Sequence, residues 1–418
     1  MSKFIIQGPV KLRGQVKISG AKNAATPLLA ATLLTKEPCF LDNIPRIADV
    51  LKMIEILQSM GAEVSFLGPH KLRICCRKIN PSKINQNLIR EMRSSILLIG
   101  PLISRFGEIE LPEPGGCIIG SRPIDTHLLG FESFGVKIKQ RGHLYHFKAE
   151  NIKKATVVLP EFSVTATENL LMLASRIKGE SIIKLAAAEP HIQILGKMLI
   201  KMGVKIKGLG THNLMIRGND SLKGTKQKNI PDQIEIGTFA VAAILTKGEV
   251  DINPVIEEHL DIILLKLRQI GVSFKIKSNH LYIYPTHKLN PFHLQALPYP
   301  GFPTDLQALF GLLATQAQGT SLIHDPLYEG RMGYINELIK MGANAILADP
   351  HRTIITGPTP LYGTDIRSLD LRAGATLIIA GLIARGETTI SQGEIIDRGY
   401  ENIEKKLQAL GANIKREE

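Results

Sequence analysis

The sequence predicts a mixed α/β protein made of six similar units, three in each of two globular halves. The first observation is a helix-like stretch that ends in glycine and leads into a short strand. It recurs at intervals of 74, 68, 68, 71 and 69 residues, with the glycines at Gly61, Gly135, Gly203, Gly271, Gly342 and Gly411. A second pattern keeps the same register: an apolar helix-like stretch, then a strand, anchored at Lys36, Gly107, Gly179, Gly248, Gly319 and Gly386. Two patterns in one register indicate an internal repeat.

Each unit reads, in order, as a helix, a strand, a second helix and two further strands. The first helix is an apolar stretch such as AKNAATPLLAA or IEIGTFAVAAI, and the first strand follows the anchor residue. The second helix ends just before its glycine, because glycine adopts the left-handed conformation that terminates many helices. A unit of about 70 residues is long for a solenoid repeat, so two globular halves are the more natural packing.

The division between the halves is expected near residues 224–231, GTKQKNIP, which are polar and contain glycine and proline. The first twenty residues alternate apolar and polar side chains and read as strand, without the apolar core of a signal peptide. They have no local partner, so we expect them to complete the second half. The predicted lobes are therefore residues 22–229, and residues 1–21 together with 230–418.

Composition excludes several classes of protein. Apolar residues make up 44% and charged residues 21%, as in an ordinary globular chain, and no run of 18 apolar residues predicts a membrane span. With no export signal, we expect a cytoplasmic protein. The cysteines do not resemble a disulfide framework or a zinc site, and no metal is expected; they are Cys39, Cys75, Cys76 and Cys117.

The net charge of +13 favours anionic ligands. The lysines are scattered singly, tryptophan is absent and aromatic residues make up 5%, so a nucleic-acid groove has little support. A lysine-rich surface without a specific partner is one alternative explanation of the charge. A basic, repeat-type nucleic-acid-binding protein is another, and it predicts salt-sensitive binding of RNA or DNA.

The starts of the six first helices carry an unusual set of residues. Counting back 14 residues from each anchor gives Lys22, Arg93, Thr165, Ile234, Asp305 and Arg372, of which four are charged. A cation is locally unfavourable at a helix N-terminus, so three of them suggest an anion in front of the helices. Solvated cations are the alternative, and for Asp305 the alternative is a helix cap. If the first helices pack side by side, their starts form a positive hollow suited to phosphate or carboxylate.

A long proline- and glycine-rich loop, LPEPGGCIIGSRPID, contains a thiol close to a cation. Nearby positive charge lowers the pKa of a thiol, so Cys117 is a candidate reactive cysteine near Arg122; an inert loop cysteine is the alternative. His127 follows on the next helix and either tunes the loop or is structural. Arg331 and Arg398 precede helices at equivalent positions of two units, and guanidinium groups suit carboxylate and phosphate.

These motifs together resemble the UDP-N-acetylglucosamine 1-carboxyvinyltransferase family of enolpyruvyl transferases over essentially the whole chain. The segments that carry the resemblance are SGAKNAATP, PGGCIIGSRPIDTH, FPTDLQA, DLRAGA and DRGYENIEKKLQALGA. The sister shikimate-pathway family shares the six-unit fold, but its lysine motif differs and it lacks the cysteine loop. The resemblance implies two lobes, each an inside-out α/β barrel of three units, with the active site in the cleft between them.

The implied reaction transfers the enolpyruvyl group of phosphoenolpyruvate to the 3-hydroxyl of UDP-N-acetylglucosamine through a tetrahedral ketal, with release of phosphate. This is the first committed step of peptidoglycan precursor synthesis. The resemblance implies a small-molecule enzyme without a cofactor, nucleic-acid partner or membrane partner, expected as a monomer and as a target of fosfomycin. Another enolpyruvyl transferase, and a paralogue that binds the nucleotide sugar without catalysis, remain alternatives.

The resemblance also implies roles for individual residues. Cys117 would protonate C3 of phosphoenolpyruvate and form an adduct with it, and Asp305 would take the proton of the sugar hydroxyl. Phosphate would be held by Lys22, Arg122 and Arg398, and the carboxylate by Arg331 and Arg372. Asn23 would orient the sugar or the intermediate, with Asp370 and His127 in support. Arg93 would contact the nucleotide side or brace the cysteine loop.

The nucleotide sugar would contact residues from both ends of the cysteine loop and from the third unit. The expected residues are Arg122, Pro123, Ile124, Asp125, Thr126, Ser163 and Val164, with Leu327 at the amino sugar. The chain departs from the family pattern at EFSVTATEN, where Glu161 and Thr165 occupy positions that often hold a lysine and a glycine. A carboxylate there would repel a diphosphate, which puts that contact in doubt.

Overall fold

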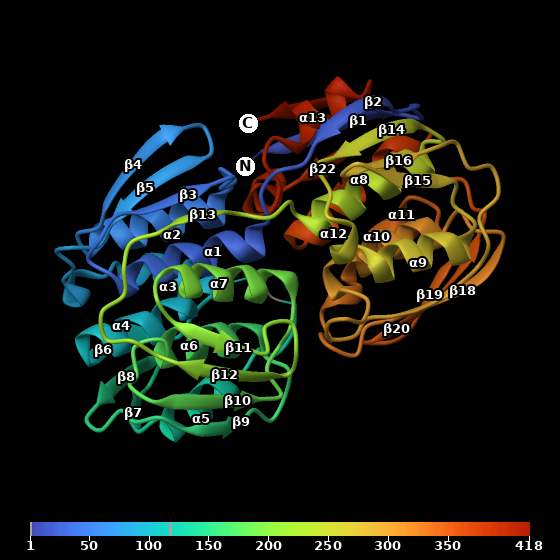
Figure 1. The fold of residues 1–418 in the computed structure, drawn as a ribbon. Helices are drawn as coiled ribbons and strands as arrows, with labels where there is room; N and C mark the ends of the chain where they lie inside the picture. The colour runs from blue at the N-terminus through green and yellow to red at the C-terminus, as the bar shows by residue number, and fades with distance from the viewer. Residues whose placement is uncertain (1, 117–118) are drawn as a thin grey trace. The chain divides into compact units, whose positions relative to one another are not determined.

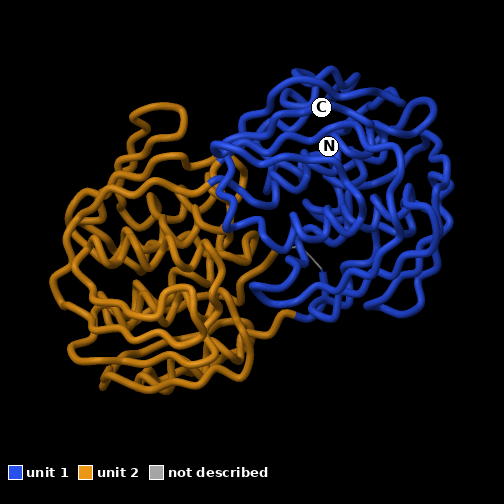
Figure 2. The backbone as a smooth tube through the Cα atoms, turned by 45° about the vertical axis from the view of Figure 1, so that its right-hand side comes forward, with its two compact units in different colours: residues 1–19, 118–121, 231–418 blue, residues 20–117, 122–230 orange. Residues whose placement is uncertain are grey.

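The computed structural model describes residues 2–116 and 119–418, which form two compact units (Figures 1 and 2). Unit 1 contains the chain up to Ser19, the segment 119–121 and residues 231–418, and unit 2 contains residues 20–116 and 122–230. The predicted lobes, 22–229 against 1–21 with 230–418, have boundaries close to these. They differ over the segment 119–121, which groups with unit 1.

Unit 2 contains the first three repeats. The first comprises α1 (Lys22–Ala31), β3 (Cys39–Asp42), α2 (Ala48–Ser59), β4 (Glu63–Gly68) and β5 (Lys71–Cys75). The second begins with α3 (Gln86–Glu91) and the 3-10 helix η3 (Arg93–Leu98), followed by α4 (Ile99–Phe106), β6 (Glu108–Pro112), α5 (Asp125–Ser133), β7 (Val136–Arg141) and β8 (Leu144–Ala149). The third comprises β9 (Thr156–Val158), α6 (Val164–Ala174), β10 (Glu180–Lys184), α7 (Pro190–Lys201), β11 (Lys205–Lys207) and β12 (Asn213–Arg217), and β13 (Lys226–Lys228) follows it.

Unit 1 repeats this order. The fourth repeat comprises α8 (Gln233–Leu245), β14 (Glu249–Asn253), α9 (Asp261–Ile270), β15 (Phe274–Lys277) and β16 (His280–Ile283). The fifth comprises β17 (His293–Gln295), the 3-10 helix η5 (Thr304–Leu306), α10 (Gln307–Ala314), β18 (Gly319–His324), η6 (Arg331–Gly333), α11 (Tyr334–Lys340), β19 (Ala345–Asp349) and β20 (Arg352–Gly357). The sixth comprises β21 (Asp365–Arg367), α12 (Leu371–Ile383), β22 (Gly386–Ser391), η7 (Gly393–Arg398), α13 (Ile403–Ala409) and β23 (Asn413–Glu417).

Each repeat forms its own sheet, in which the last strand lies between the first and second strands and runs antiparallel to both. An example is the order β3-β5-β4, to which β13 adds a parallel edge strand. The sixth repeat has no last strand of its own. Its place is filled by β1 (Lys3–Gly8), which pairs with both β22 and β23, while β2 (Arg13–Lys17) joins the fourth sheet beside β14. Both strands of the first twenty residues therefore pair with strands of unit 1.

The glycines of the first pattern end their helices as predicted. All six adopt positive φ angles, between 87° and 109°. In the second pattern Gly107, Gly179, Gly319 and Gly386 have positive φ, whereas Lys36 and Gly248 do not. In the fourth repeat the left-handed residue is Lys247, with φ 51°. Gly248 is required for another reason: a Cβ atom there would lie 2.4 Å from the carbonyl oxygen of Leu12.

The first helices of the repeats form the interior, and the sheets lie outside them. In unit 1, α8, α10 and α12 contact one another, and every residue from Ile234 to Leu245 of α8 is buried. In unit 2, α4 packs against α6, and α1 contacts η3. A helix that is apolar all round is stable only when it is covered on all sides, which the surrounding sheets and second helices achieve (Figure 1). The predicted inside-out α/β fold is confirmed.

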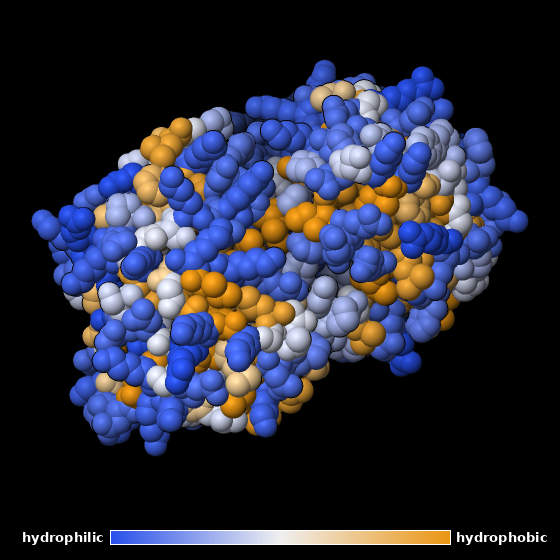
Figure 3. Space-filling view, viewed as in Figure 1, coloured by the Kyte–Doolittle hydropathy of each residue, from blue (hydrophilic) through white to orange (hydrophobic). Residues whose placement is uncertain are grey.

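On the face drawn in Figure 3 most residues are hydrophilic, and apolar residues form separate patches. No helix in the described part of the chain is both long and apolar enough to cross a membrane. Cys39, Cys75 and Cys76 are buried free cysteines, and burial raises the pKa of the Cys39 thiol to about 11 and that of Cys76 to about 12. They are therefore core residues, as expected from their apolar sequence context. Cys117 lies outside the described residues.

Candidate active site

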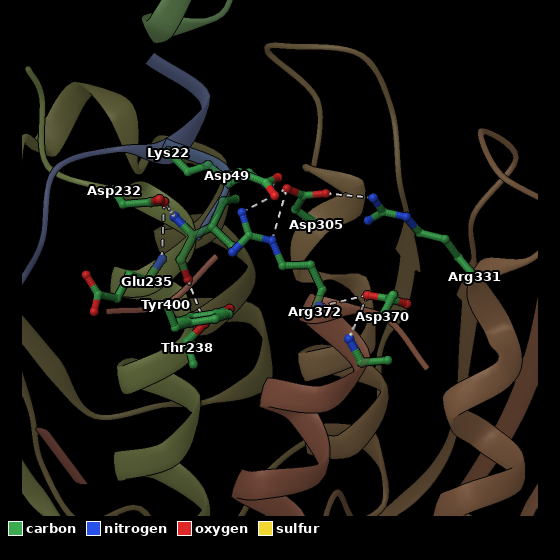
Figure 4. Close-up of polar contacts among 12 residues, drawn as sticks. Lys22, Asp49, Asp232, Glu235, Thr238, Asp305, Arg331, Asp370, Arg372 and Tyr400 are labelled. Carbon is green, nitrogen blue, oxygen red and sulfur yellow. Dashed lines mark hydrogen bonds and ion pairs between the residues drawn. The ribbon is translucent and has the colours of Figure 1, made fainter. Parts of the chain in front are cut away.

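The most concentrated group of predicted site residues lies in unit 1, where Asp305 forms ion pairs with two arginines (Figure 4). One carboxylate oxygen lies 2.8 Å from Nη2 of Arg331, and the other lies 3.1 Å from Nη2 and 3.2 Å from Nε of Arg372. Asp305 is in η5, just before α10, and Arg372 is in the first turn of α12. Because the central helices pack together, Asp305 and Arg372, 67 positions apart in the sequence, meet where two of these helices begin.

These arginines are buried, with side chains 11% and 5% exposed for Arg331 and Arg372. Burial opposes the charge of both, but nearby carboxylates, Asp305 first, outweigh it and raise the pKa of each guanidinium. Each also lies over an aromatic ring, Arg331 5.0 Å from the centre of Tyr328 and Arg372 5.3 Å from that of Tyr400. The rings and the carboxylate hold both cations in place.

Some donors of this group are not satisfied. Nη1 of Arg372 and Nε of Arg331 are buried and have no hydrogen-bond partner among the described residues. A buried donor without a partner costs about 1–3 kcal/mol, and more if it is charged. Two such donors beside one carboxylate are the feature expected of a site that accepts a further anion.

Asp370 supports this group through the backbone. It is the N-cap of α12, and its carboxylate accepts hydrogen bonds from the backbone N–H groups of Arg372 at 2.7 Å and Ala373 at 3.0 Å. Asp232 caps α8 in the same way. Asp305, by contrast, is not the cap residue of its helix, which is Pro303, so the helix-cap alternative does not describe it. Its carboxylate faces the arginines.

In unit 2, Lys22 is the first residue of α1 and forms an ion pair with Asp49 at 2.7 Å. The two side chains are only 13% and 4% exposed. Asp49 could not be identified from the sequence as the partner of Lys22. It lies in the first turn of α2, where an acidic residue is already explained by its favourable interaction with the helix dipole. Asn23, next to Lys22, is exposed.

Arg93 is the first residue of η3, and its Nη2 donates hydrogen bonds to the carbonyl oxygens of Arg122 at 2.5 Å and Pro123 at 3.2 Å. These hydrogen bonds connect the start of η3 to the end of the cysteine loop. On the other side of the loop, Glu329 accepts a hydrogen bond from the backbone N–H of Ser121 at 2.7 Å.

The two departures from the family pattern have partners inside unit 2. Glu161 accepts a hydrogen bond from the hydroxyl of Thr126 at 2.9 Å, and the hydroxyl of Thr165 lies 2.9 Å from Nε2 of His127. Both contacts link α5 to the start of α6, so these side chains serve the packing of the two helices.

The remaining predicted residues lie at the ends of elements. Pro123 and Asp125 are exposed and Ile124 is buried, while Ser163 is the N-cap of α6, which begins at Val164. Arg398 ends η7 and is partly exposed. Leu327 is 37% exposed, and its backbone N–H donates to the buried Asp325 at 3.0 Å. Sequence analysis does not identify Asp325, whose pKa is raised by burial.

His127 is buried, 3% exposed, and burial, reinforced by the positive charge of Arg93, lowers its pKa to about 3. The structural alternative therefore describes it: the ring is neutral at ordinary pH and pairs with Thr165.

This burial predicts a pH-dependent loss of stability. Between about pH 6.5 and pH 3 an unfolded chain binds a proton at this position and the folded chain does not, so the free energy of unfolding falls as pH falls below 6.5. From pH 7.5 to pH 5.5 we expect the wild type to lose about 1.4 kcal/mol more than His127→Gln, measured by urea unfolding. The control is His143→Gln, whose side chain is 89% exposed and should behave as the wild type. Equal losses for wild type and His127→Gln would contradict the prediction.

The comparisons with known proteins agree with this fold. A family model described as EPSP synthase (3-phosphoshikimate 1-carboxyvinyltransferase) matches residues 6–407. A UDP-N-acetylglucosamine 1-carboxyvinyltransferase of Koribacter versatilis is 43% identical over 419 residues, covering 100% of this chain and 96% of its own length. One from Helicobacter pylori is 42% identical and covers 98% of each chain. This chain belongs to the UDP-N-acetylglucosamine 1-carboxyvinyltransferase family of enolpyruvyl transferases.

Solved structures of enolpyruvyl transferases share the whole fold. The enolpyruvyl transferase NikO from Streptomyces tendae has a TM-score of 0.91 at 25% identity, over 99% of this chain and 98% of its own. An EPSP synthase from Acinetobacter baumannii has a TM-score of 0.75 at 18% identity over 100% of both chains, which shows likeness of fold. Among the residues that the structure describes, no group of His, Cys, Asp and Glu suits a metal ion.

Proposed function

We propose that this protein transfers the enolpyruvyl group of phosphoenolpyruvate to the 3-hydroxyl of UDP-N-acetylglucosamine and releases inorganic phosphate. Membership of the family supports this reaction. The observation that carries it is the carboxylate of Asp305 between two arginines, each of which has one buried donor without a partner among the described residues. Such a group provides a base and an anion-binding surface at one place, which addition of a hydroxyl to phosphoenolpyruvate requires.

Asp305 is proposed to accept the proton of the sugar hydroxyl. In the structure both its oxygens are occupied by arginines. The carboxylate of phosphoenolpyruvate competes with Asp305 for Arg331 and Arg372, so binding of this substrate would free an oxygen for the incoming hydroxyl. Asp305 would therefore become available as a base only after phosphoenolpyruvate has bound, when the sugar hydroxyl has a carbon to attack.

Lys22, Arg122 and Arg398 are proposed to hold the phosphate. Lys22 already has a counter-charge in Asp49, which keeps its ammonium in one position. A lysine held in this way acts as a fixed point charge, while the guanidinium groups supply directed hydrogen bonds. Asn23, which is exposed at the start of α1, is proposed to orient the sugar or the intermediate.

Cys117 is proposed to act on C3 of the enolpyruvyl group, and also to form an adduct with phosphoenolpyruvate. In the addition step its thiol gives a proton to C3, C2 becomes electrophilic, and the sugar oxygen bonds to C2 as Asp305 takes the hydroxyl proton. In the elimination step a proton passes from the C3 methyl group to the Cys117 thiolate, and the C2–C3 double bond forms again. The C2–O bond to phosphate breaks, and the leaving phosphate takes up the proton held by Asp305. The net products are the enol ether and inorganic phosphate.

The nucleotide sugar is proposed to bind along the end of the cysteine loop and the start of α6, with Leu327 at the amino sugar. The residues proposed for this contact are Arg93, Arg122, Pro123, Ile124, Asp125, Thr126, Ser163 and Val164. The hydroxyl of Thr126 donates to the carboxylate of Glu161, which holds this side chain against α5. We further propose a cytoplasmic monomer without nucleic-acid or membrane partners.

The decisive test is release of inorganic phosphate from phosphoenolpyruvate, with UDP-N-acetylglucosamine or shikimate 3-phosphate supplied in separate reactions. We expect release with the nucleotide sugar alone. Release with shikimate 3-phosphate instead would assign the sister reaction. Folded protein that releases phosphate with neither would indicate a binding paralogue and overturn the proposed activity.

A further inference from the structure

A second basic site lies in unit 2, away from the residues proposed for catalysis. It is a hollow of about 470 Å³ at the C-terminal ends of α4 and α6. Four cations line it, together with one hydroxyl and two apolar side chains; the lining residues are Ser104, Ile152, Lys153, Lys154, Arg176, Ile177 and Lys178. The proposed nucleotide contacts are at the opposite end of α6, about 16 Å away for a helix of this length.

Arg176 is the innermost cation of this hollow. Its Nη1 donates to the carbonyl oxygen of Leu34 at 2.8 Å, while its buried Nε has no hydrogen-bond partner among the described residues. Arg105 lies close enough to Arg176 for the two charges to repel each other. Its guanidinium group donates hydrogen bonds to the carbonyl oxygens of Leu33, Thr35 and Cys76. Burial lowers the pKa of both guanidinium groups, and for Arg176 the nearby carboxylate of Asp220 opposes this shift in part.

Lys153 and Lys154 are exposed, and local contacts hold the segment that carries them. The stem of Lys154 packs against Gly179, where a Cβ atom would lie 2.9 Å from its Cδ. The backbone N–H of Lys153 is anchored on the carbonyl oxygen of Phe134 at 3.1 Å. Lys178 forms an ion pair with Asp220 at 3.0 Å, and both of these side chains are more than half exposed. Within the described residues, Lys153, Lys154 and Arg176 have no such partner.

The fold does not require cations here. At the position equivalent to Arg176, three residues before the repeat anchor, the units of unit 1 have Leu245, Gln316 and Ile383. Gln316 donates to the carbonyl oxygen of Thr359 at 2.8 Å, so a neutral amide can satisfy a carbonyl at this end of a central helix. The positive charge of Arg176 is therefore not needed to satisfy a carbonyl at the end of the helix. Part of the net charge of +13 gathers around this hollow.

We propose that this hollow binds a small phosphorylated metabolite. A phosphate suits a guanidinium beside two lysines, because it accepts several charge-assisted hydrogen bonds at once. The volume is that of an ordinary small-ligand site, and the walls of Ile152 and Ile177 offer an apolar surface to the rest of such a ligand. A hollow of this size favours a compact ligand over an acidic peptide. Its position away from the proposed catalytic residues makes it a regulatory or effector site.

The test is equilibrium dialysis of the full-length protein with radiolabelled pyrophosphate at constant ionic strength. The variant is Lys153→Gln with Lys154→Gln, which leaves the buried arginines in place. The matched control is Lys275→Gln with Lys277→Gln, which removes the same charge from the exposed face of β15 in unit 1. We expect pyrophosphate binding to weaken about tenfold or more in the hollow variant and by less than about twofold in the control.

A second variant examines the arginine. Arg176→Lys keeps the positive charge and removes the guanidinium group with its paired donors. It should weaken pyrophosphate binding, while the free energy of unfolding in urea stays close to that of the wild type. Phosphate release by the double lysine variant at saturating substrates should equal that of the wild type, because neither lysine is proposed to touch the reactants. Equal loss of pyrophosphate binding in the hollow and control variants would overturn the proposal. So would binding of hexaglutamate, lost in the hollow variant, without any binding of pyrophosphate.

Discussion

Replacing Cys117 with serine is expected to lower turnover by about a thousandfold or more while binding of UDP-N-acetylglucosamine persists. A thiol titrates near neutral pH and can give a proton to C3 and take one back, whereas a serine hydroxyl cannot serve as either acid or base there. Turnover is measured by phosphate release and nucleotide-sugar binding by calorimetry. Normal turnover in the serine variant would remove the acid–base role from Cys117.

Cys117→Asp separates proton transfer from thiol chemistry. A carboxylic acid can still move a proton, so this variant should retain activity, but it should no longer be alkylated by fosfomycin-type epoxides. The background is low, since Cys39, Cys75 and Cys76 are all buried. Inactivation of the aspartate variant at the wild-type rate would show that the epoxide acts elsewhere.

Asp305→Ala is expected to reduce the single-turnover rate by about 10²–10⁴-fold, with a much smaller effect on nucleotide-sugar binding. The variant loses the proposed base and also leaves Arg331 and Arg372 without their shared carboxylate. An unchanged single-turnover rate would rule out the base role.

A structural cause must be separated from a chemical one, because removing one partner of a buried ion pair destabilises by about 3–5 kcal/mol. Asp305→Asn keeps the shape of the side chain and removes the basic oxygen, so it should also lose the chemical step. The matched control is Asp397→Asn, which breaks the more exposed ion pair with Arg416 in the same unit. It should leave the single-turnover rate within about twofold of the wild type, because an exposed pair contributes only about 0–1 kcal/mol.

The helix starts show how far sequence reasoning reaches. Counting within the repeat places Lys22, Arg93 and Arg372 in the first turns of their helices, where the structure has them. It leaves open whether such cations face solvent, an anion or a carboxylate of the chain itself. The structure answers differently in each case: Lys22 pairs with Asp49, Arg93 donates to loop carbonyls, and Arg372 pairs with Asp305.

The family pattern is a stronger guide to chemistry than to contacts. It correctly draws attention to Glu161 and Thr165 as departures, but it reads Glu161 as a free carboxylate near a diphosphate. Glu161 is hydrogen-bonded to Thr126 and Thr165 to His127, across 35 and 38 residues of sequence. Contacts at this separation cannot be predicted from a local sequence pattern. The role of Cys117 rests on the loop motif and on the family, since that residue lies outside the described part of the structure.

Local physics explains why the six-unit architecture can be read from the chain alone. Helical periodicity and a glycine in the left-handed conformation are properties of a few consecutive residues, so Gly61 or Gly411 marks its helix end without reference to the rest of the molecule. Long-range packing decides the remainder. The insertion of β1 between β22 and β23 and the meeting of Asp305 with Arg331 and Arg372 depend on elements hundreds or tens of residues apart, brought together by burial of the central helices. Those contacts form because apolar helices must be covered and buried charges must be paired, and only the folded chain determines which partners meet.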